Sequence, residues 1–103
     1  MEQLLHYVWK HKIFPLSALQ TTSGRPVEVI DPGLPNMNAG PDFFNAKLKI
    51  DGTLWVGNVE VHTQASEWLL HRHDCDKAYD TVILHVVGES NCDVYRTNGE
   101  LVP

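Results

Sequence analysis

The sequence predicts an α/β sandwich with a mixed central sheet, and the pattern and order of its segments support that prediction. Helical spacing of apolar residues occurs at the amino terminus and again near residues 65–79, while the stretches between and after them have the alternating or β-branched character of strands. The order is helix, one or two strands, hairpin, helix and strand, without internal repeats. A chain of 103 residues can bury one core, so residues 1–103 are expected to form a single domain.

The amino-terminal part is expected to contain one helix and two short strands. Apolar residues at helical spacing predict a helix over about the first eleven residues: Leu4, Leu5, Val8 and Trp9. From Pro15 to Ile30 the chain is expected to be extended, with "ALQTT" and "PVEVI" as strands separated by a turn at "SGRP". The following "DPGLPNMNAGP" predicts a loop, because it is rich in proline, glycine and asparagine.

The remaining segments predict a hairpin, a helix and further strands. Strands at Asp42 to Ile50 and Thr53 to His62 are joined around "DG". The stretch "ASEWLLHRHDCDKAY" predicts a helix capped by Ser66, with one face formed by Trp68, Arg72, Cys75 and Tyr79. "TVILHVV" and "CDVYRT" predict strands. The final "NG" turn is followed only by "ELV" and a proline, which is the start of the second strand of a hairpin. We therefore expect the chain to be the amino-terminal fragment of a longer protein.

Composition restricts the class of protein. A formal net charge of -5 argues against a broad basic surface, so any contact with DNA or RNA is expected to be local. Cys75 and Cys92 form no CxxC pair and fit free thiols in a reducing cytoplasm. The amino terminus lacks a long uncharged run, which predicts a cytoplasmic protein without a membrane segment. Oligomeric state has no signal in the sequence.

The parity of the hairpin turn decides which polar side chains share a face of the sheet. A two-residue turn at Asp51 and Gly52 places Asp42 opposite Val61, away from Glu60 and His62. A three-residue loop with a left-handed Gly52 places Asp42 opposite Glu60 instead. The first strand is expected to bury Phe44, Ala46 and Leu48, because lysine and asparagine occupy its odd positions. With either turn, the second strand would bury a comparable set of apolar side chains. The hydrophobic pattern therefore does not decide between the two-residue and the three-residue turn.

"PD" at Pro41 and Asp42, and "EVH" from Glu60 to His62, on consecutive strands, resemble the PD-(D/E)xK nuclease superfamily. The resemblance implies a restriction-endonuclease-like αβββαβ sandwich that hydrolyses phosphodiesters with Mg²⁺ or Mn²⁺. Asp42 and Glu60 would then be metal ligands, and His62 would stand where the superfamily has a catalytic lysine. Since a neutral imidazole carries no permanent charge, an inactive binding module of the same fold is an alternative.

A second resemblance covers nearly the whole chain. "GPDF", "NVEVH", "SEWLLHRHDCDKAYD" and "VILHVV" resemble an uncharacterised bacterial family classed as a domain of unknown function. Members of that family are considerably longer, which implies that the remainder of a parent chain is a partner of this part. The family resemblance implies no activity.

Histidines suggest a third hypothesis, a zinc hydrolase built on His62, His71, His73 and Asp76. Residues two apart point in opposite directions on a helix, so His71 and His73 can reach one ion only at a helix end or an irregular turn. Charge compensation at a helix end is an equally good explanation of that pair. His85, inside an apolar strand, is expected to be a hydrogen-bonded core histidine; if its strand adjoins that of His62, it would instead orient that imidazole.

Overall fold

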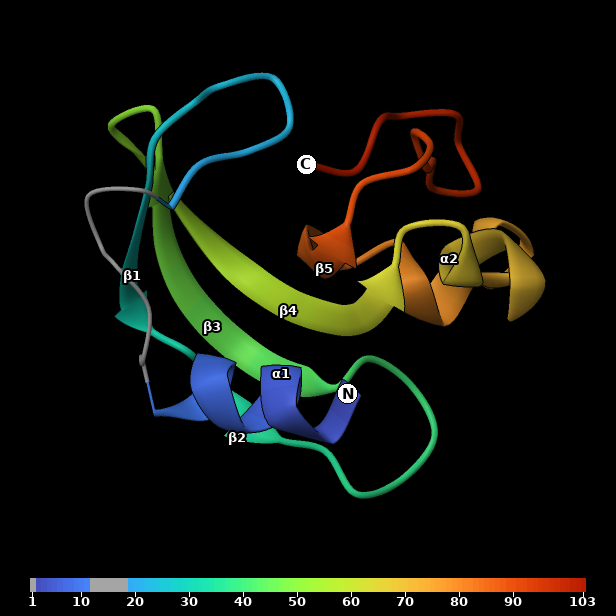
Figure 1. The fold of residues 1–103 in the computed structure, drawn as a ribbon, viewed down its shortest axis with the longest axis horizontal. Helices are drawn as coiled ribbons and strands as arrows, with labels where there is room; N and C mark the ends of the chain where they lie inside the picture. Colours follow the sequence, from blue (N-terminus) through green and yellow to red (C-terminus); the bar gives the residue numbers. More distant parts are fainter. Residues whose placement is uncertain (1, 12–18) are drawn as a thin grey trace.

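The computed structural model describes residues 2–11 and 19–103, which form an α/β fold on a mixed, open five-stranded sheet (Figure 1). Its elements in chain order are α1 (Glu2–Lys10), β1 (Val27–Asp31), β2 (Leu34–Pro35), β3 (Phe43–Ile50), β4 (Thr53–Gln64), α2 (Glu67–Leu70), the 3-10 helices η2 (His73–Cys75) and η3 (Lys77–Tyr79), and β5 (Val82–Glu89). Within the described residues, no helix is long and apolar enough to cross a membrane.

The sheet has the order β1-β3-β4-β5, and the short β2 pairs with the amino-terminal end of β3. β1, β3 and β4 are antiparallel, whereas β5 runs parallel to β4 and next to it. The parallel connection passes through α2 and the two 3-10 helices, as a crossover between parallel strands requires. The predicted α/β class and mixed sheet are therefore confirmed.

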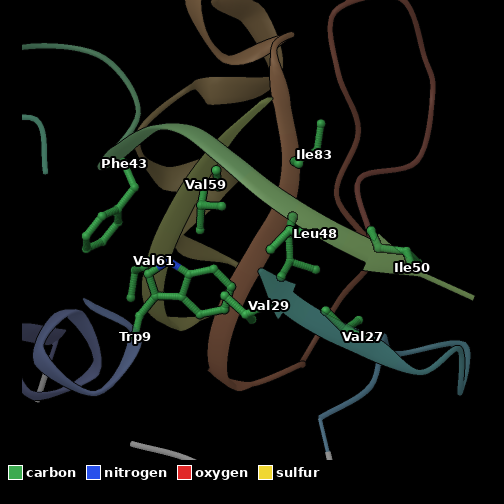
Figure 2. Close-up of a cluster of buried hydrophobic side chains, with 11 residues drawn as sticks. Trp9, Val27, Val29, Phe43, Leu48, Ile50, Val59, Val61 and Ile83 are labelled. Atoms are coloured by element: carbon green, nitrogen blue, oxygen red, sulfur yellow. The ribbon is translucent and has the colours of Figure 1, made fainter. Parts of the chain in front are cut away.

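One face of the sheet carries the main apolar cluster, which α1 covers with Trp9. Figure 2 shows the Trp9 indole lying beside Val61 and the strands that converge there. Trp9 is buried, and its indole N–H donates to the carbonyl of Pro32 at 3.0 Å. Burial of an aromatic side chain of this size is worth several times the thermal energy, so Trp9 fixes α1 on the sheet.

The opposite face is covered by α2, the 3-10 helices and the carboxyl-terminal segment. Trp68 and Tyr79 belong to a second buried cluster there, together with Val82, Val94 and others. The indole N–H of Trp68 donates to the carbonyl of Tyr95 at 3.1 Å. Alternation along β4 sends Val59 and Val61 to the first cluster and Glu60 and His62 to this second face. The polar side chains of Glu60 and His62 are thus buried on the same side of the sheet as the aromatic rings of Trp68 and Tyr79.

Several sequence predictions about individual elements are wrong. The helix predicted over "ASEWLLHRHDCDKAY" ends at Leu70 and is followed by two 3-10 helices. Trp68 and Tyr79 are buried while Arg72 and Cys75 are exposed, so the four do not share one helical face. "CDVYRT" is not a strand, because only Tyr95 forms a bridge, to Leu101. The predicted loop after Asp31 contains β2.

Two further predictions are met in part. Among the described residues of "ALQTT", Leu19 to Thr22, only Gln20 forms a bridge, to Pro26, whereas the strand predicted at "PVEVI" is present as β1. Residues 12–18 lie outside the described residues, so the extended segment predicted from Pro15 is described only from Leu19 onward.

The hairpin between β3 and β4 has the two-residue turn, and Ile50 pairs with Thr53. Asp51 and Gly52 have φ of 52° and 80°, the left-handed pair that a type I′ turn needs. That register was predicted to separate Asp42 from Glu60, and this prediction is wrong. The reason is a β-bulge at the amino-terminal end of β3.

The bulge lies between Phe43 and Ala46, where β3 uses one residue more than β4. Phe43 pairs with Val59 and Ala46 with Gly57, and Asn45 between them has a left-handed φ of 59°. An extra residue in one strand reverses the parity of everything beyond it. Phe43 is therefore buried in place of the predicted Phe44, which is half-buried.

Candidate metal centre

The polar groups gather where β3 begins and β4 ends. Asp42 immediately precedes β3, and the bulge brings it opposite Glu60 on β4. The backbone N–H of Asp42 donates to Glu60 Oε1 at 3.1 Å. In return, the N–H of Val61 donates to Asp42 Oδ2 at 2.8 Å. The two acidic residues are thus held together by reciprocal bonds to each other's strand.

Three imidazoles converge beside Glu60: those of His62, His71 and His73. One ring nitrogen from each lies within 4.8 Å of the others. His62 Nε2 is 3.3 Å from His71 Nδ1 and 3.3 Å from Glu60 Oε2. His73 Nε2 lies 2.9 Å from the same carboxylate oxygen. A tetrahedral ion with bonds of about 2.0–2.2 Å separates its ligand atoms by roughly 3.3–3.6 Å. The two 3.3 Å spacings match this range, and the 2.9 Å contact between His73 and Glu60 is shorter.

A break in the helix allows His71 and His73 to reach the same point. α2 ends at Leu70, and Arg72 adopts a left-handed conformation with φ 58° and ψ 33° before η2 begins at His73. This reversal places two imidazoles that are two residues apart on one side of the chain. The irregular turn that the sequence hypothesis required is therefore present.

Neighbouring rings hold the buried imidazoles in place. His62 Nδ1 lies 2.8 Å from His85 Nε2, which comes from the adjacent parallel strand. His73 stacks on Tyr79, with ring centroids 3.6 Å apart, and Trp68 meets its edge. Ligand orientation of this kind by a second layer of residues is typical of metal sites. His85 therefore contacts the cluster, rather than serving as an isolated core histidine.

Burial keeps the imidazoles neutral. Burial, and then the neighbouring His73 imidazole, lower the pKa of His62 to about 4. Burial, followed by His62, lowers the pKa of His85 to about 3, and burial also lowers the pKa of His73. A neutral imidazole is the form that binds a metal ion, so His62 and His73 need to lose no proton at neutral pH.

The pKa of the Glu60 carboxyl group shifts in the opposite direction. Burial, then the charge of Asp42 and a hydrogen bond between the two carboxyl groups, raise the pKa of Glu60 to about 9. Because both Glu60 and its imidazole neighbours favour their neutral forms without a cation, the contacts of Glu60 with His62 and His73 are close polar contacts rather than ion pairs. A cation at this place would reverse the balance and favour the carboxylate.

The structure brings together most of the residues that the sequence indicated. Asp42, Glu60, His62, His71, His73 and His85 form one continuous group. Asp76 does not join it, because its carboxylate instead accepts the N–H of Ala78 at 2.9 Å and begins η3. Access to the group is from one side, since His71 is exposed while His62 and His73 are buried.

Sequence reasoning missed one member of the group, His6. Its Nε2 lies 3.4 Å from Asp42 Oδ2, and its ring packs at 5.7 Å from that of Phe43. A signal was present, because His6 and Glu2 are four residues apart and therefore share a face of α1. The role of Arg72, by contrast, depends on a left-handed backbone conformation that arginine does not favour, whereas asparagine at position 45 is a residue type that adopts this conformation more readily.

Fold and site together define a small α/β protein with a buried cluster of histidines that could hold a metal ion. The chain belongs to the family described as "Protein of unknown function (DUF2851)", whose profile matches residues 2–103. No curated protein matches the chain, and no solved structure does. The resemblance to an uncharacterised family is thereby confirmed, and the fold is established at the level of an α/β protein with a mixed sheet.

Proposed function

We propose that this protein is a metal-dependent hydrolase whose ion is held by His62, His71 and His73. The observation that carries the proposal is the convergence of three imidazole nitrogens within 4.8 Å. One of them, His73 Nε2, is buried without a hydrogen-bond partner. Imidazole ligands favour zinc and similar transition metals over magnesium, so zinc fits this group best.

The arrangement also matches the requirement for an open coordination position. Catalytic zinc sites use three protein ligands and leave a place for water or substrate, whereas structural sites are closed. Exposure of His71 leaves that side of the cluster accessible to solvent. The bound ion would supply Lewis-acid activation of water and of the scissile group.

Residues of the chain have separate tasks in this proposal. Glu60 Oε2, placed against His62 and His73, would add a carboxylate ligand to the three imidazoles, so that water would bind as a fifth ligand on the exposed side of His71. His85 fixes the His62 ring through the 2.8 Å contact at Nδ1. Trp68 and Tyr79 exclude water from the inner side of the cluster. Asp42 holds the Glu60 carboxyl group from the other side.

The test combines metal binding with turnover. Protein stripped with a chelator should bind zinc at the three imidazoles with submicromolar affinity by calorimetry, and His71→Ala and His73→Ala should each weaken this binding at least tenfold. His11→Ala, on the exposed end of α1, is the matched control and should bind like the wild type. The zinc-loaded protein should hydrolyse a chromogenic ester or phosphodiester. Absence of zinc binding contradicts the proposal, and binding without turnover indicates the inactive binding module.

A second candidate is the nuclease-like hydrolase, in which Asp42 and Glu60 hold Mg²⁺ or Mn²⁺ and His62 stands at the position of the missing lysine. Its support is that the β3 bulge brings Asp42 and Glu60 together despite the two-residue turn. The element order is also compatible with a restriction-endonuclease-like sandwich. Cleavage of DNA or RNA with Mn²⁺ but not with Zn²⁺, lost in Asp42→Asn, would favour this candidate.

A further inference from the structure

Two buried imidazole nitrogens lack a hydrogen-bond partner, and among the described residues they are the only buried side-chain nitrogen or oxygen atoms in that state: His6 Nε2 and His73 Nε2. Buried polar groups in folded proteins are almost always hydrogen-bonded, so such exceptions call for a physical explanation. Each nitrogen lies beside a carboxylate oxygen, at 3.4 Å from Asp42 and 2.9 Å from Glu60 respectively. Neither nitrogen has a hydrogen-bond partner, and a cation placed between each nitrogen and its carboxylate would satisfy both atoms.

The two carboxylates link these unpartnered nitrogens. Glu60 Oε2 faces His62 and His73, while its Oε1 faces the Asp42 backbone. Asp42 Oδ2 in turn faces His6 on α1. Glu60 therefore stands between two groups of potential ligands, the three imidazoles on one side and His6 with Asp42 on the other.

Negative charge gathers around the second group. Glu2 lies one helical turn before His6, and burial followed by the charge of Asp42 raises its pKa. Carboxylates brought together in this way are stabilised by a divalent cation.

We propose that the protein holds a second divalent cation between His6 and Asp42, with Glu60 bridging it to the ion at His62, His71 and His73. The inference rests on the proposed function, because the second position shares Glu60 with that centre. One imidazole and two carboxylates suit zinc or manganese. Paired ions stabilise both the attacking and the leaving oxygen of a displacement at phosphorus, so the substrate class becomes phosphate esters.

Cobalt(II) tests the number of ions because it reports both stoichiometry and ligand type. The full chain, stripped with a chelator, is titrated with Co²⁺ while its visible absorption is followed, and bound metal is counted after gel filtration. His6→Gln and His6→Ala are compared with His11→Gln, which changes a histidine on the same segment away from the site. Near-ultraviolet circular dichroism confirms that each variant keeps the wild-type packing. Electron paramagnetic resonance of the wild type loaded with Mn²⁺ gives a second measurement that needs no variant.

The proposal predicts two ions per chain in the wild type and His11→Gln, one in both His6 variants, and a spin-coupled manganese spectrum in the wild type. One ion in every protein, with an uncoupled manganese spectrum, overturns the second position and leaves the three-histidine centre intact. Two ions in the His6 variants overturn the assignment of His6. No bound ion in any protein overturns this inference and the proposed function together.

Discussion

Asp42 lies opposite Glu60 although the turn that joins their strands has the parity that would separate them. Its backbone N–H donates to Glu60 Oε1 at 3.1 Å, while Ile50 pairs with Thr53 at the turn. The extra residue at the bulge reconciles these two observations. The acidic pair therefore depends on a backbone feature several residues away from either carboxyl group.

The first prediction concerns Asn45, whose φ of 59° makes the bulge possible. Asn45→Val places a β-branched residue in the left-handed region and should lower the free energy of unfolding by about 1–2 kcal/mol. Asn45→Gly should stay within roughly 0.5 kcal/mol of the wild type, because glycine adopts this conformation freely. Urea unfolding measures both. Equal stability of the two variants would show that the bulge is not under conformational strain.

The second prediction concerns Arg72, whose left-handed backbone lets His71 and His73 meet. Its side chain is exposed, so Arg72→Gly should leave zinc affinity within about twofold. Arg72→Val disfavours the left-handed conformation and should weaken zinc binding roughly tenfold or more. Competition with a chromophoric chelator gives the affinities. If valine binds zinc as well as glycine does, the turn is not what aligns the two imidazoles.

The third prediction concerns His85 as a positioning residue for His62. For His62 Nε2 to face the cluster as an acceptor, its proton must sit on Nδ1 and be donated to His85 Nε2 at 2.8 Å. His85→Phe keeps a ring but removes the acceptor, and zinc affinity should fall about 10–100-fold. His85→Gln restores an acceptor and should recover part of the loss. Identical affinities in both variants would show that the contact serves packing alone.

The fourth prediction is a pH dependence of the metal-free protein. The pKa of His85 falls to about 3 and that of His62 to about 4 in the folded state, against about 6.5 in an unfolded chain. Between these values the unfolded chain binds more protons at the two histidines, so their contribution to stability is complete above about pH 6.5 and decreases as the pH falls toward 4. The raised pKa of Glu60 acts in the opposite direction, because its contribution decreases as the pH rises toward about 9. Urea midpoints at pH 7.5, 6 and 5 test this. His85→Phe should reduce the slope, and a slope unchanged from wild type would contradict the assignment.

Part of the site could be predicted from the sequence because it depends on regular strands. Glu60 and His62 alternate on one strand, so they share a face wherever that strand lies. His85 lies in an apolar strand, and parallel pairing with β4 brings it to His62. The helix of Trp9 and the order of elements also follow from hydrophobic spacing. Except for the pairing of β5 with β4, which the sequence left open, these inferences needed no long-range geometry.

The remaining features depend on backbone irregularities that local pattern does not specify. "FFNA" permits burial of either phenylalanine, and the choice of Phe43 follows only from the bulge. Arg72 is not a residue that favours left-handed backbone, yet its conformation replaces the continuous helix that the apolar spacing predicted. Packing of Trp68 and Tyr79 around His73 overrides the local preference for helix there.

X-ray absorption at the zinc edge tests the central claim most directly, namely that His62, His71 and His73 hold one ion. With one equivalent of zinc added to the metal-free protein, we expect scattering from about three imidazole rings at the zinc–nitrogen distance of about 2.0–2.1 Å. His71→Ala should remove one ring from that shell. A shell of oxygen atoms alone, or a spectrum that His71→Ala leaves unchanged, would contradict the account.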